Sequence, residues 1–229
     1  EYLCLPEHLL LPLPDAVSYE TGALTEPLAV AWRAVCQAGD LTGKTVLIVG
    51  AGTIGLLALQ AVRLKNPSLI LVSEISPARA ERARLFGADG VVDPTRTPLS
   101  DWLAGQGARD GIDVSIEAVG LSVTAAQALD ALKPGGTSIW IGNHQRQITC
   151  DMQSIVTREL TIRGTYIYSP DQFAQALVLL AKKCSDIRIY RPYTVFRCFF
   201  CSVFGNSGFH FRRCTEGPYR SKFFCNRWK

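Results

Sequence analysis

The stretch Thr45–Leu56, with the sequence TVLIVGAGTIGL, decides the fold. Its first five residues are β-branched or aliphatic without alternation, which is typical of a strand buried on both faces of a parallel sheet. Three glycines follow as G-x-G-x-x-G, at Gly50, Gly52 and Gly55. In a dinucleotide site the first makes the tight turn, the second lets the backbone approach a pyrophosphate, and the third lets the next helix pack closely on the strand. The stretch therefore predicts a strand, a phosphate-binding turn and a helix over residues 54–65, whose N-terminus favours an anion.

A carboxylate follows at the distance along the chain that a nucleotide ribose requires. The second apolar run, residues 69–72, leads to Glu74, which lies 19 residues after Gly55, and a dinucleotide site expects an acidic residue about 20 residues on. A carboxylate there accepts hydrogen bonds from both ribose hydroxyls and repels a 2′-phosphate, so it favours NAD over NADP. Two interpretations of Arg79 stay open: it stacks over the adenine, or it is an ordinary solvated helix residue.

Strands and helices alternate along most of the chain. We expect strands at residues 45–49, 69–72, 90–93, 112–117, 137–141 and 160–165, and helices at 54–65, 77–86, 101–104, 124–132, 151–158 and 170–183. This alternation predicts an α/β fold, a Rossmann doubly wound parallel sheet with the strand order 3-2-1-4-5-6. The ligand of such a sheet lies across the carboxyl ends of the strands at the switch point.

The composition is that of a globular protein. No stretch approaches the roughly 18 uninterrupted apolar residues of a membrane helix, and residues 1–10, EYLCLPEHLL, lack the basic segment of a signal peptide. We therefore expect a cytoplasmic protein that does not interact with membranes.

The net charge of +4 is unevenly distributed. Residues 1–190 hold 16 Lys and Arg against 19 Asp and Glu, whereas residues 191–229 hold 8 basic residues against one acid. Eight of the ten Phe and four of the eight Cys also lie in the last segment. The change predicts that residues 190–229 form an atypical basic tail, which is disordered or arises from a shifted reading frame or a misjoined exon.

The composition of this tail suggests two candidate functions. Its cysteines are spaced as C-x2-C-x12-C-x10-C, and the second pair is too far apart for a zinc finger. Aromatic residues between arginines suit single-stranded nucleic acid, but no binding fold presents them, so nucleic acid is disfavoured as a partner. An interaction protein that acts through its basic tail remains an alternative.

Residues 1–44 contain proline-punctuated extended pieces and then helical stretches. Ser18 is a suitable N-cap for a first helix, and Pro27 is expected to open a second helix that ends at Gly39. Glu26 lies between them, and the local pattern leaves two roles open, capping of the following helix or a place in a functional site.

The residues quoted so far resemble a known family. Leu13–Ala31, LPDAVSYETGALTEPLAVA, followed by Gly43–Gly55, GKTVLIVGAGTIG, resembles the zinc-dependent medium-chain dehydrogenase/reductases. The similarity is greatest to the branch of sorbitol, galactitol-phosphate and threonine dehydrogenase-like proteins. Further matches lie at residues 116–120, 133–137, 141–143 and 163–166, and the resemblance covers about residues 11–189.

The resemblance implies an NAD-dependent oxidation of a secondary alcohol, a polyol or a polyol phosphate. In relatives a catalytic zinc polarises the alcohol, because zinc lowers the pKa of a bound oxygen ligand, and hydride passes to nicotinamide C4. Glu26 matches the family glutamate that lies by the zinc, as a ligand or through a water, which makes it the catalytic and metal-binding candidate here. The strand ends and the resemblance together give the expected cofactor contacts: Gly50, Gly52, Thr53, Ile54, Gly55, Glu74, Arg79, Val119, Gly120, Ile141, Gly142, Asn143, Thr165, Tyr166 and Ile167.

The segments of the chain that match the family, and those that do not, give the expected domain boundaries. Residues 1–44 resemble only the end of the family's GroES-like catalytic domain and its connecting helices, and they match none of its other zinc-ligand motifs. Residues 45–189 are expected to form the NAD-binding Rossmann domain. We therefore expect a fragment that binds cofactor and by itself oxidises no alcohol, an inactive dinucleotide-binding module. Relatives in the sorbitol group often carry arginine where Ile167 stands, so no particular polyol is assigned, and relatives commonly form dimers or tetramers by pairing the last strands.

Overall fold

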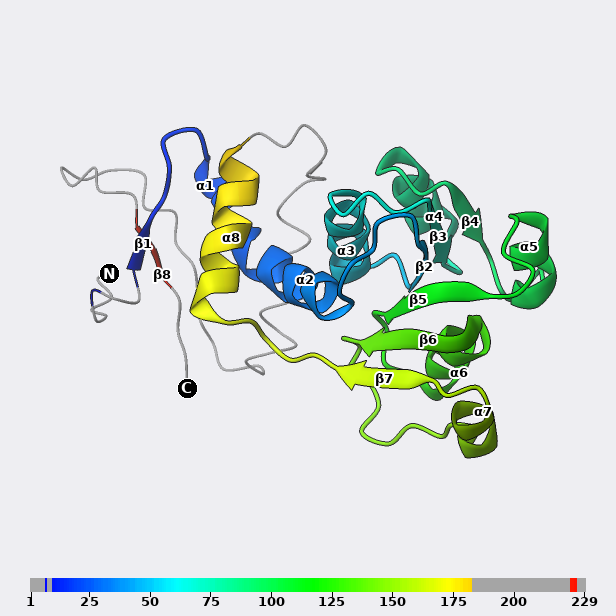
Figure 1. Ribbon diagram of the computed structural model, residues 1–229. Coiled ribbons are helices and arrows are strands. Elements are labelled where there is room, and N and C mark those ends of the chain that lie inside the picture. Colours follow the sequence, from blue (N-terminus) through cyan, green and yellow to red (C-terminus); the bar gives the residue numbers. More distant parts are fainter. Residues whose placement is uncertain (1–6, 8–9, 183–222, 226–229) are drawn as a thin grey trace.

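A computed structural model describes residue 7 and residues 10–182 and 223–225 of the chain. Its main sheet has six parallel strands in the order β4-β3-β2-β5-β6-β7. The strands are β2 (Thr45–Val49), β3 (Leu69–Ser73), β4 (Gly90–Val92), β5 (Ile112–Glu117), β6 (Leu132–Trp140) and β7 (Thr161–Gly164). Counted from β2, this is the order 3-2-1-4-5-6, so the predicted Rossmann topology is confirmed (Figure 1).

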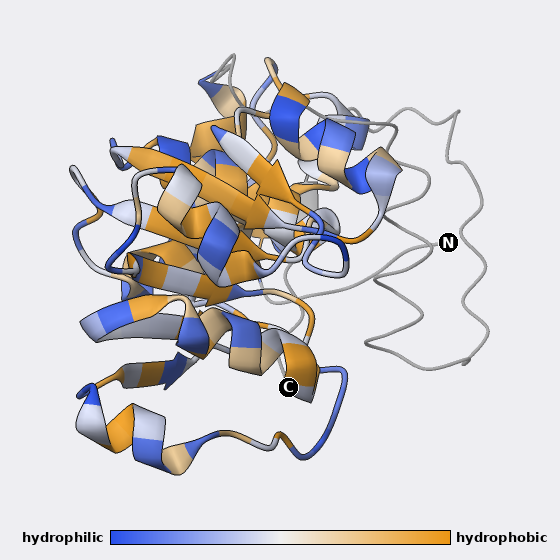
Figure 2. Cartoon of the chain, turned by 90° about the vertical axis from the view of Figure 1, so that its right-hand side faces the viewer, coloured by the Kyte–Doolittle hydropathy of each residue, from blue (hydrophilic) through white to orange (hydrophobic). Residues whose placement is uncertain are grey.

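Helices cover both faces of the sheet. They are α1 (Tyr19–Gly22), α2 (Thr25–Gln37), α3 (Thr53–Arg63), α4 (Pro77–Leu85), α5 (Leu99–Gly105), α6 (Ser122–Asp130), α7 (Met152–Thr157) and α8 (Pro170–Ala181). In Figure 2 the strands are mostly orange, that is hydrophobic, and the helices around them carry both hydrophobic and hydrophilic residues. The strand pattern explains this arrangement, because Val46 and Ile48 enter the core cluster under α2 and α3 while Leu47 and Val49 enter the cluster that includes residues of α5 and α6. A strand that is apolar without alternation is thus buried on both faces, as expected.

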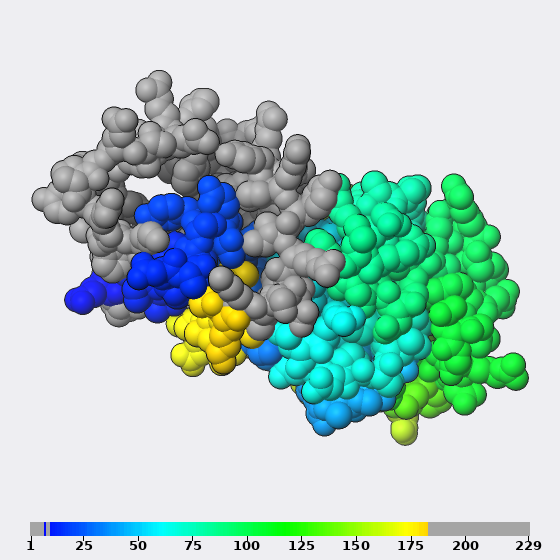
Figure 3. All heavy atoms as spheres, turned by 90° about the horizontal axis from the view of Figure 1, so that it is seen from above, coloured from blue at the N-terminus to red at the C-terminus, as the bar shows by residue number. Residues whose placement is uncertain are grey.

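The segment before the sheet is packed against the last described helix. Ser18 caps α1, since its hydroxyl accepts a hydrogen bond from the Thr21 amide at 3.1 Å. Leu13 and Val17 are buried against Leu177 of α8, and Figure 3 shows α8 in gold beside the blue N-terminal segment. Chain segments distant in sequence are therefore brought together around α8.

Two element boundaries differ from the expected ones in an informative way. Helix α2 starts at Thr25 rather than at Pro27, which the helix tolerates because the first four amides of a helix have no intrahelical partner. Strand β6 starts at Leu132, where residue 137 was expected, since Leu132 already pairs with Ile112 before a register shift in the ladder. The other predicted elements of the sheet and its helices have the expected type and nearly the expected bounds.

The predicted tail, residues 190–229, lies outside the described residues except for β8 (Phe223–Cys225), which pairs antiparallel with β1 (Leu10–Pro12). Within the part of the chain that the structure describes, no helix is both long enough and apolar enough to cross a membrane.

The packing of α3 on β2 gives a first prediction. A Cβ placed on Gly55 would lie 1.9 Å from the Gly50 carbonyl oxygen, whereas one placed on Gly52 would meet nothing within 4 Å. We expect Gly55→Ala to lower the free energy of unfolding by about 3 kcal/mol through overpacking, as measured by urea denaturation. Gly52→Ala is the matched control, with an expected loss of at most about 1 kcal/mol for the poorer N-cap. Equal losses in the two variants would contradict this account of the turn.

Candidate dinucleotide-binding site

The turn between β2 and α3 has the backbone that its glycines predict. Gly50 has a φ of 94°, in the left-handed region that favours glycine, and a Cβ there would lie 2.5 Å from the Val119 side chain. Gly52 is the N-cap of α3 in an extended conformation, and no side chain caps that helix. The first turn of α3, which includes the candidates Thr53, Ile54 and Gly55, therefore offers backbone N–H groups and the positive end of the helix dipole to an anion.

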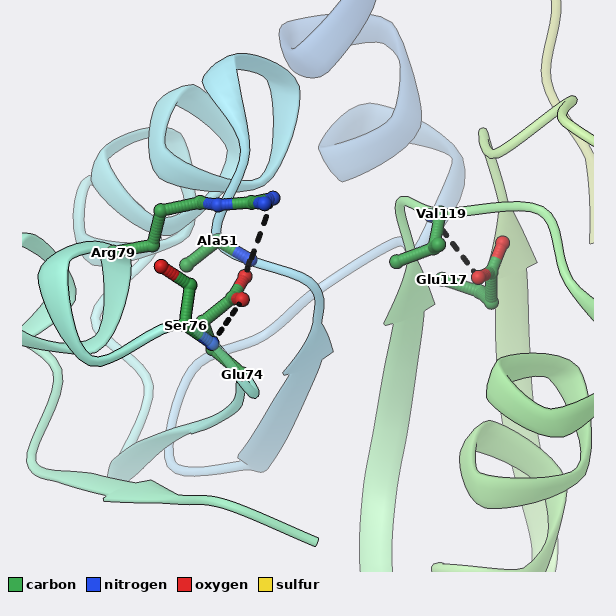
Figure 4. A network of polar contacts seen from close by, with 6 residues as sticks. All are labelled: Ala51, Glu74, Ser76, Arg79, Glu117 and Val119. Atoms are coloured by element: carbon green, nitrogen blue, oxygen red, sulfur yellow. Dashed lines mark hydrogen bonds and ion pairs between the residues drawn. The ribbon is translucent and has the colours of Figure 1, made fainter. Parts of the chain in front are cut away.

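Glu74 lies directly beside this turn, at the end of the neighbouring strand. Its Oε2 accepts a hydrogen bond from the Ala51 amide at 2.7 Å, and its Oε1 accepts one from the Ser76 amide at 2.8 Å (Figure 4). The side chain is 3% exposed, while that of Arg79, with Nη1 3.9 Å from Glu74 Oε2, is 51% exposed. Each carboxylate oxygen retains a second acceptor site, so Glu74 binds the turn and can still accept a ribose hydroxyl.

A cavity of about 320 Å³ opens beside Glu74 on the α4 side. Ile75, which is 61% exposed, contributes to its wall with Pro77 and Val92. Arg84 and Arg96 also line it, each in an ion pair with an acidic residue three positions earlier in the chain. The cavity thus extends the Glu74 site along the surface and is lined by both apolar and charged residues.

The loops that follow β5 and β6 are pressed together at the same edge of the sheet. The amides of Ile141 and Gly142 both donate to the Glu117 carbonyl, at 2.9 and 3.0 Å. A Cβ on Gly120 would lie 2.4 Å from the Asn143 amide nitrogen. The absence of a side chain at Gly120 therefore allows the two loops to pass close to each other.

The loop after β7 joins the same edge. The Thr165 amide donates to the Trp140 carbonyl at 2.9 Å, and the Thr165 hydroxyl is buried with no hydrogen-bond partner among the described residues. Tyr166 is 75% exposed, and Ile167 has a φ of 58°, an unusual value for a β-branched residue. The structure therefore places the predicted contacts of the turn and of the strand-end loops along one edge of the sheet.

Glu26 lies in the first turn of α2, at some distance along the chain from these loops. Leu24 is the N-cap of α2 and makes no side-chain cap hydrogen bond, and Glu26 is the acidic residue of the first turn, where a negative charge favours the helix. Burial raises the pKa of Glu26 to about 7, and a hydrogen bond with Tyr168 opposes part of that rise. Burial, with the nearby Glu26 carboxylate, also raises the pKa of Tyr168. Glu26 Oε2 is buried and lacks a partner among the described residues, so it is available to a metal ion or to a metal-bound water.

Three residues of this region were missed from the sequence. Tyr168 follows β7 by four residues and forms a hydrogen bond with Glu26, which lies far from it in the sequence. Ser76 supplies only a backbone amide to Glu74, which no side-chain pattern reveals. For Glu117 the only signal in the sequence was its position, since it ends a buried strand just as Glu74 follows one.

A glycine turn after the first strand, a carboxylate after the second and a bare helix N-terminus define the class of dinucleotide-binding Rossmann domains. Comparison with known proteins specifies the family. Residues 53–182 match the model of the zinc-binding dehydrogenase family, and the chain belongs to that family. The predicted resemblance is thereby confirmed.

Individual relatives are similar over the same region. The (R,R)-butanediol dehydrogenase of Bacillus subtilis is 35% identical over 180 residues, which are 79% of this chain and 51% of that protein. The L-threonine 3-dehydrogenase of Rhizobium johnstonii is 30% identical over 166 residues, 72% of this chain and 48% of that protein. A zinc-binding dehydrogenase of Sinorhizobium meliloti, solved with NADP bound, is 31% identical with a TM-score of 0.70, over 77% of this chain and 52% of that one. The chain thus spans about half the length of these relatives and covers the cofactor-binding portion.

The burial of Glu26 predicts a pH dependence of stability. Its pKa in the folded chain is about 7 against an ordinary 4.5, so between these values the folded chain binds more protons than the unfolded chain. The free energy of unfolding therefore falls as the pH rises through this window, by up to about 3 kcal/mol. We expect Glu26→Gln to remove this fall, as measured by urea denaturation with a chelator present at about pH 5 and about pH 8.

The exposed Glu81 supplies the control for that measurement, since its side chain is 66% exposed. Glu81→Gln is expected to keep the pH dependence of the parent chain. A Glu26→Gln variant with the parent's pH dependence would show that Glu26 is ionised in the folded chain well below pH 7.

Proposed function

We propose that this chain forms the NAD-binding portion of an oxidoreductase that transfers hydride from a secondary alcohol, a polyol or a polyol phosphate to NAD. The observation that carries the proposal is the Glu74 carboxylate, held 2.7 Å from the Ala51 amide inside the glycine turn. This contact puts a ribose-binding group and a phosphate-binding turn side by side, and one nucleotide can engage both.

The cofactor is proposed to lie along the carboxyl edge of the sheet. The pyrophosphate binds at Gly50, Gly52 and the first turn of α3, and the adenosine ribose binds Glu74, with Arg79 beside it. The nicotinamide half then reaches the loops after β5, β6 and β7. The residues assigned to that half are Val119, Gly120, Ile141, Gly142, Asn143, Thr165, Tyr166 and Ile167.

Glu74 favours NAD over NADP in this proposal. A 2′-phosphate would meet a carboxylate whose side chain is only 3% exposed and is fixed by two backbone amides. Arg79 is half exposed and could pair with that phosphate, and one relative was solved with NADP. Because the Glu74 carboxylate is buried and fixed by two amides while the Arg79 side chain is half exposed, we expect the repulsion by Glu74 to prevail.

The metal of this family is proposed to meet the chain at Glu26. A buried carboxylate oxygen without a partner in the described region fits a metal ion or its water. When bound, zinc supplies a lowered pKa of the substrate hydroxyl. Tyr168 orients the Glu26 carboxylate, and the loops at residues 141–143 and 165–167 orient the nicotinamide ring and exclude water from its face.

The substrate class is proposed from the relatives. Two of them are named for butanediol and for the 3-position of threonine, and both names specify a secondary alcohol. The alternative, a dinucleotide-binding module without catalysis, is favoured by one observation: among the described residues no group of three or more His, Cys, Asp and Glu side chains could hold a metal ion. We expect the chain by itself to bind cofactor and to show no alcohol oxidation.

A second copy of the chain is the proposed protein partner. Strand β7 ends the sheet and is exposed along its whole length, and an exposed edge strand can pair with an identical strand. A homodimer, or a tetramer built from it, would use this edge. The proposed location is the cytoplasm, and nucleic acid is not a proposed partner.

The cofactor proposal is tested by titrating the chain with NADH and with NADPH, followed by energy transfer from tryptophan to the nicotinamide. We expect saturable binding with a lower Kd for NADH. In Glu74→Ala we expect this preference to be lost and the Kd for NADH to rise roughly tenfold or more, because a hydrogen bond to a charged group disappears. Binding of neither nucleotide, in a chain shown by circular dichroism to be folded, would refute the proposal.

The edge-strand proposal is tested by size-exclusion chromatography with light scattering. We expect the parent chain to be dimeric and Ile162→Lys to be mainly monomeric, because like charges that face each other across paired strands repel. Val178, which is 48% exposed on α8, supplies the control Val178→Lys, which should leave the dimer intact. A monomeric parent chain, or a dimer in Ile162→Lys, would exclude pairing through β7.

A further inference from the structure

The Glu117 carboxylate is the second buried acid at the carboxyl edge of the sheet. It ends β5, and the residue is 1% exposed. Its Oε1 accepts hydrogen bonds from the amides of Val119 at 3.0 Å and Gly120 at 2.8 Å, and its Oε2 accepts from Gly120 at 3.0 Å. One side chain therefore fixes the turn that leaves β5.

The same residue contacts the loop that leaves β6. The Glu117 carbonyl accepts the amides of Ile141 and Gly142, and a Cβ on Gly142 would lie 2.4 Å from Glu117 Oε2. The Gly120 carbonyl accepts the Gln145 amide at 2.8 Å, which binds the two loops together further out. Glu117 is thus at the centre of the contact between loops 118–120 and 141–143.

Figure 4 shows the two acids at the ends of the strands on either side of β2, each turned toward backbone amides. Glu74 has Arg79 nearby. Among the described residues no Lys or Arg forms an ion pair with Glu117, so backbone N–H groups supply its stabilisation. Burial of a carboxylate without a cation partner destabilises the folded state unless the carboxylate accepts hydrogen bonds of good geometry.

We propose that Glu117 is a positioning residue for the nicotinamide half of the cofactor. It holds loops 118–120 and 141–143 in the mutual arrangement that receives the nicotinamide and its ribose, while Glu74 binds the adenosine half directly. The proposal rests on the NAD-binding function proposed above. Glu74 and Glu117, which occupy similar places at strand ends in the sequence, therefore have different roles.

The geometry explains why a carboxylate is needed. The Val119 and Gly120 amides make three contacts with the Glu117 carboxylate, and both of its oxygens accept hydrogen bonds. Glutamine presents one oxygen and one NH₂ group, so Glu117→Gln places a donor against the Gly120 or Val119 amide. We expect loops 118–120 and 141–143 to separate in that variant while Gly50, Gly52 and Glu74 keep their places.

The experiment compares two ligands that share the adenosine half. The Kd values of NADH and of ADP are measured by calorimetry for the parent chain and for Glu117→Gln. We expect the Kd of NADH to rise roughly tenfold and that of ADP less than about twofold, as for the loss of a hydrogen bond to a charged group on one half of the site. Gly142→Ala should give the same pattern by pushing the two loops apart, because a Cβ there would lie 2.1 Å from the Gly120 amide nitrogen and 2.4 Å from Glu117 Oε2.

Ile116→Val is the matched control, because Ile116 is the buried neighbour of Glu117 in β5 and does not contact either loop through a polar group. It should lower stability slightly and change neither Kd. A purely structural role of Glu117 would alter the two Kd values equally or not at all in Glu117→Gln, and either result would overturn the inference. Failure of the parent chain to bind both NADH and ADP would instead refute the proposed function.

Hydrogen exchange of the unaltered chain gives a test that does not depend on whether a variant folds. The amides of Val119 and Gly120 should exchange slowly before any ligand is added, because the carboxylate already binds them. NADH, but not ADP, should slow them further. Exchange at the rate of an unstructured loop would show that Glu117 does not hold this turn.

Discussion

The burial of β2 on both of its faces is the constraint on which the rest of the structure depends. Val46 and Ile48 belong to one core, and Leu47 and Val49 to the other, so helices must cover both sides and crossovers must lead in both directions from this strand. The reversal of strand order at β2 and β5 opens the edge where loops from both halves meet. The burial of β2 on both faces therefore determines both how the core forms and where the strand order reverses.

Carboxylates bind strand-end amides at both edges of this sheet. At the amino edge, Asp113 accepts the Thr45 amide at 2.9 Å and pairs with Lys133, so its charge is balanced by a side chain. At the carboxyl edge, Glu117 performs the same mechanical role with backbone donors alone among the described residues. The two acids therefore differ in how their charge is balanced, by a lysine for Asp113 and by backbone N–H groups for Glu117.

The sequence was informative where one local pattern determines one local geometry. The run Thr45–Leu56 predicted strand, turn and helix because apolar continuity and glycine spacing are local, and Glu74 followed from its spacing. The role of Glu117 was not predictable, because it depends on Gly142, which adjoins it only after β6 has paired with β5. The early start of β6 was missed for a similar reason, since Leu132 pairs with Ile112 only in the folded sheet. The register shift before Thr137 leaves the Lys133–Gly136 segment outside the regular pairing.

Ile167 shows how far tertiary structure can override a local preference. A β-branched residue at a φ of 58° costs of order 1–3 kcal/mol, and no pattern in the sequence announces it. The strain is sustained by neighbours on both sides, where the Thr165 amide binds the Trp140 carbonyl and Tyr168 packs on Phe173 with ring centroids 5.4 Å apart. The loop after β7 is thus held in one shape by the folded core before any ligand arrives. A ligand that fits this shape would lose little free energy in ordering it, so the strained Ile167 is compatible with the place that the proposed nicotinamide site gives it.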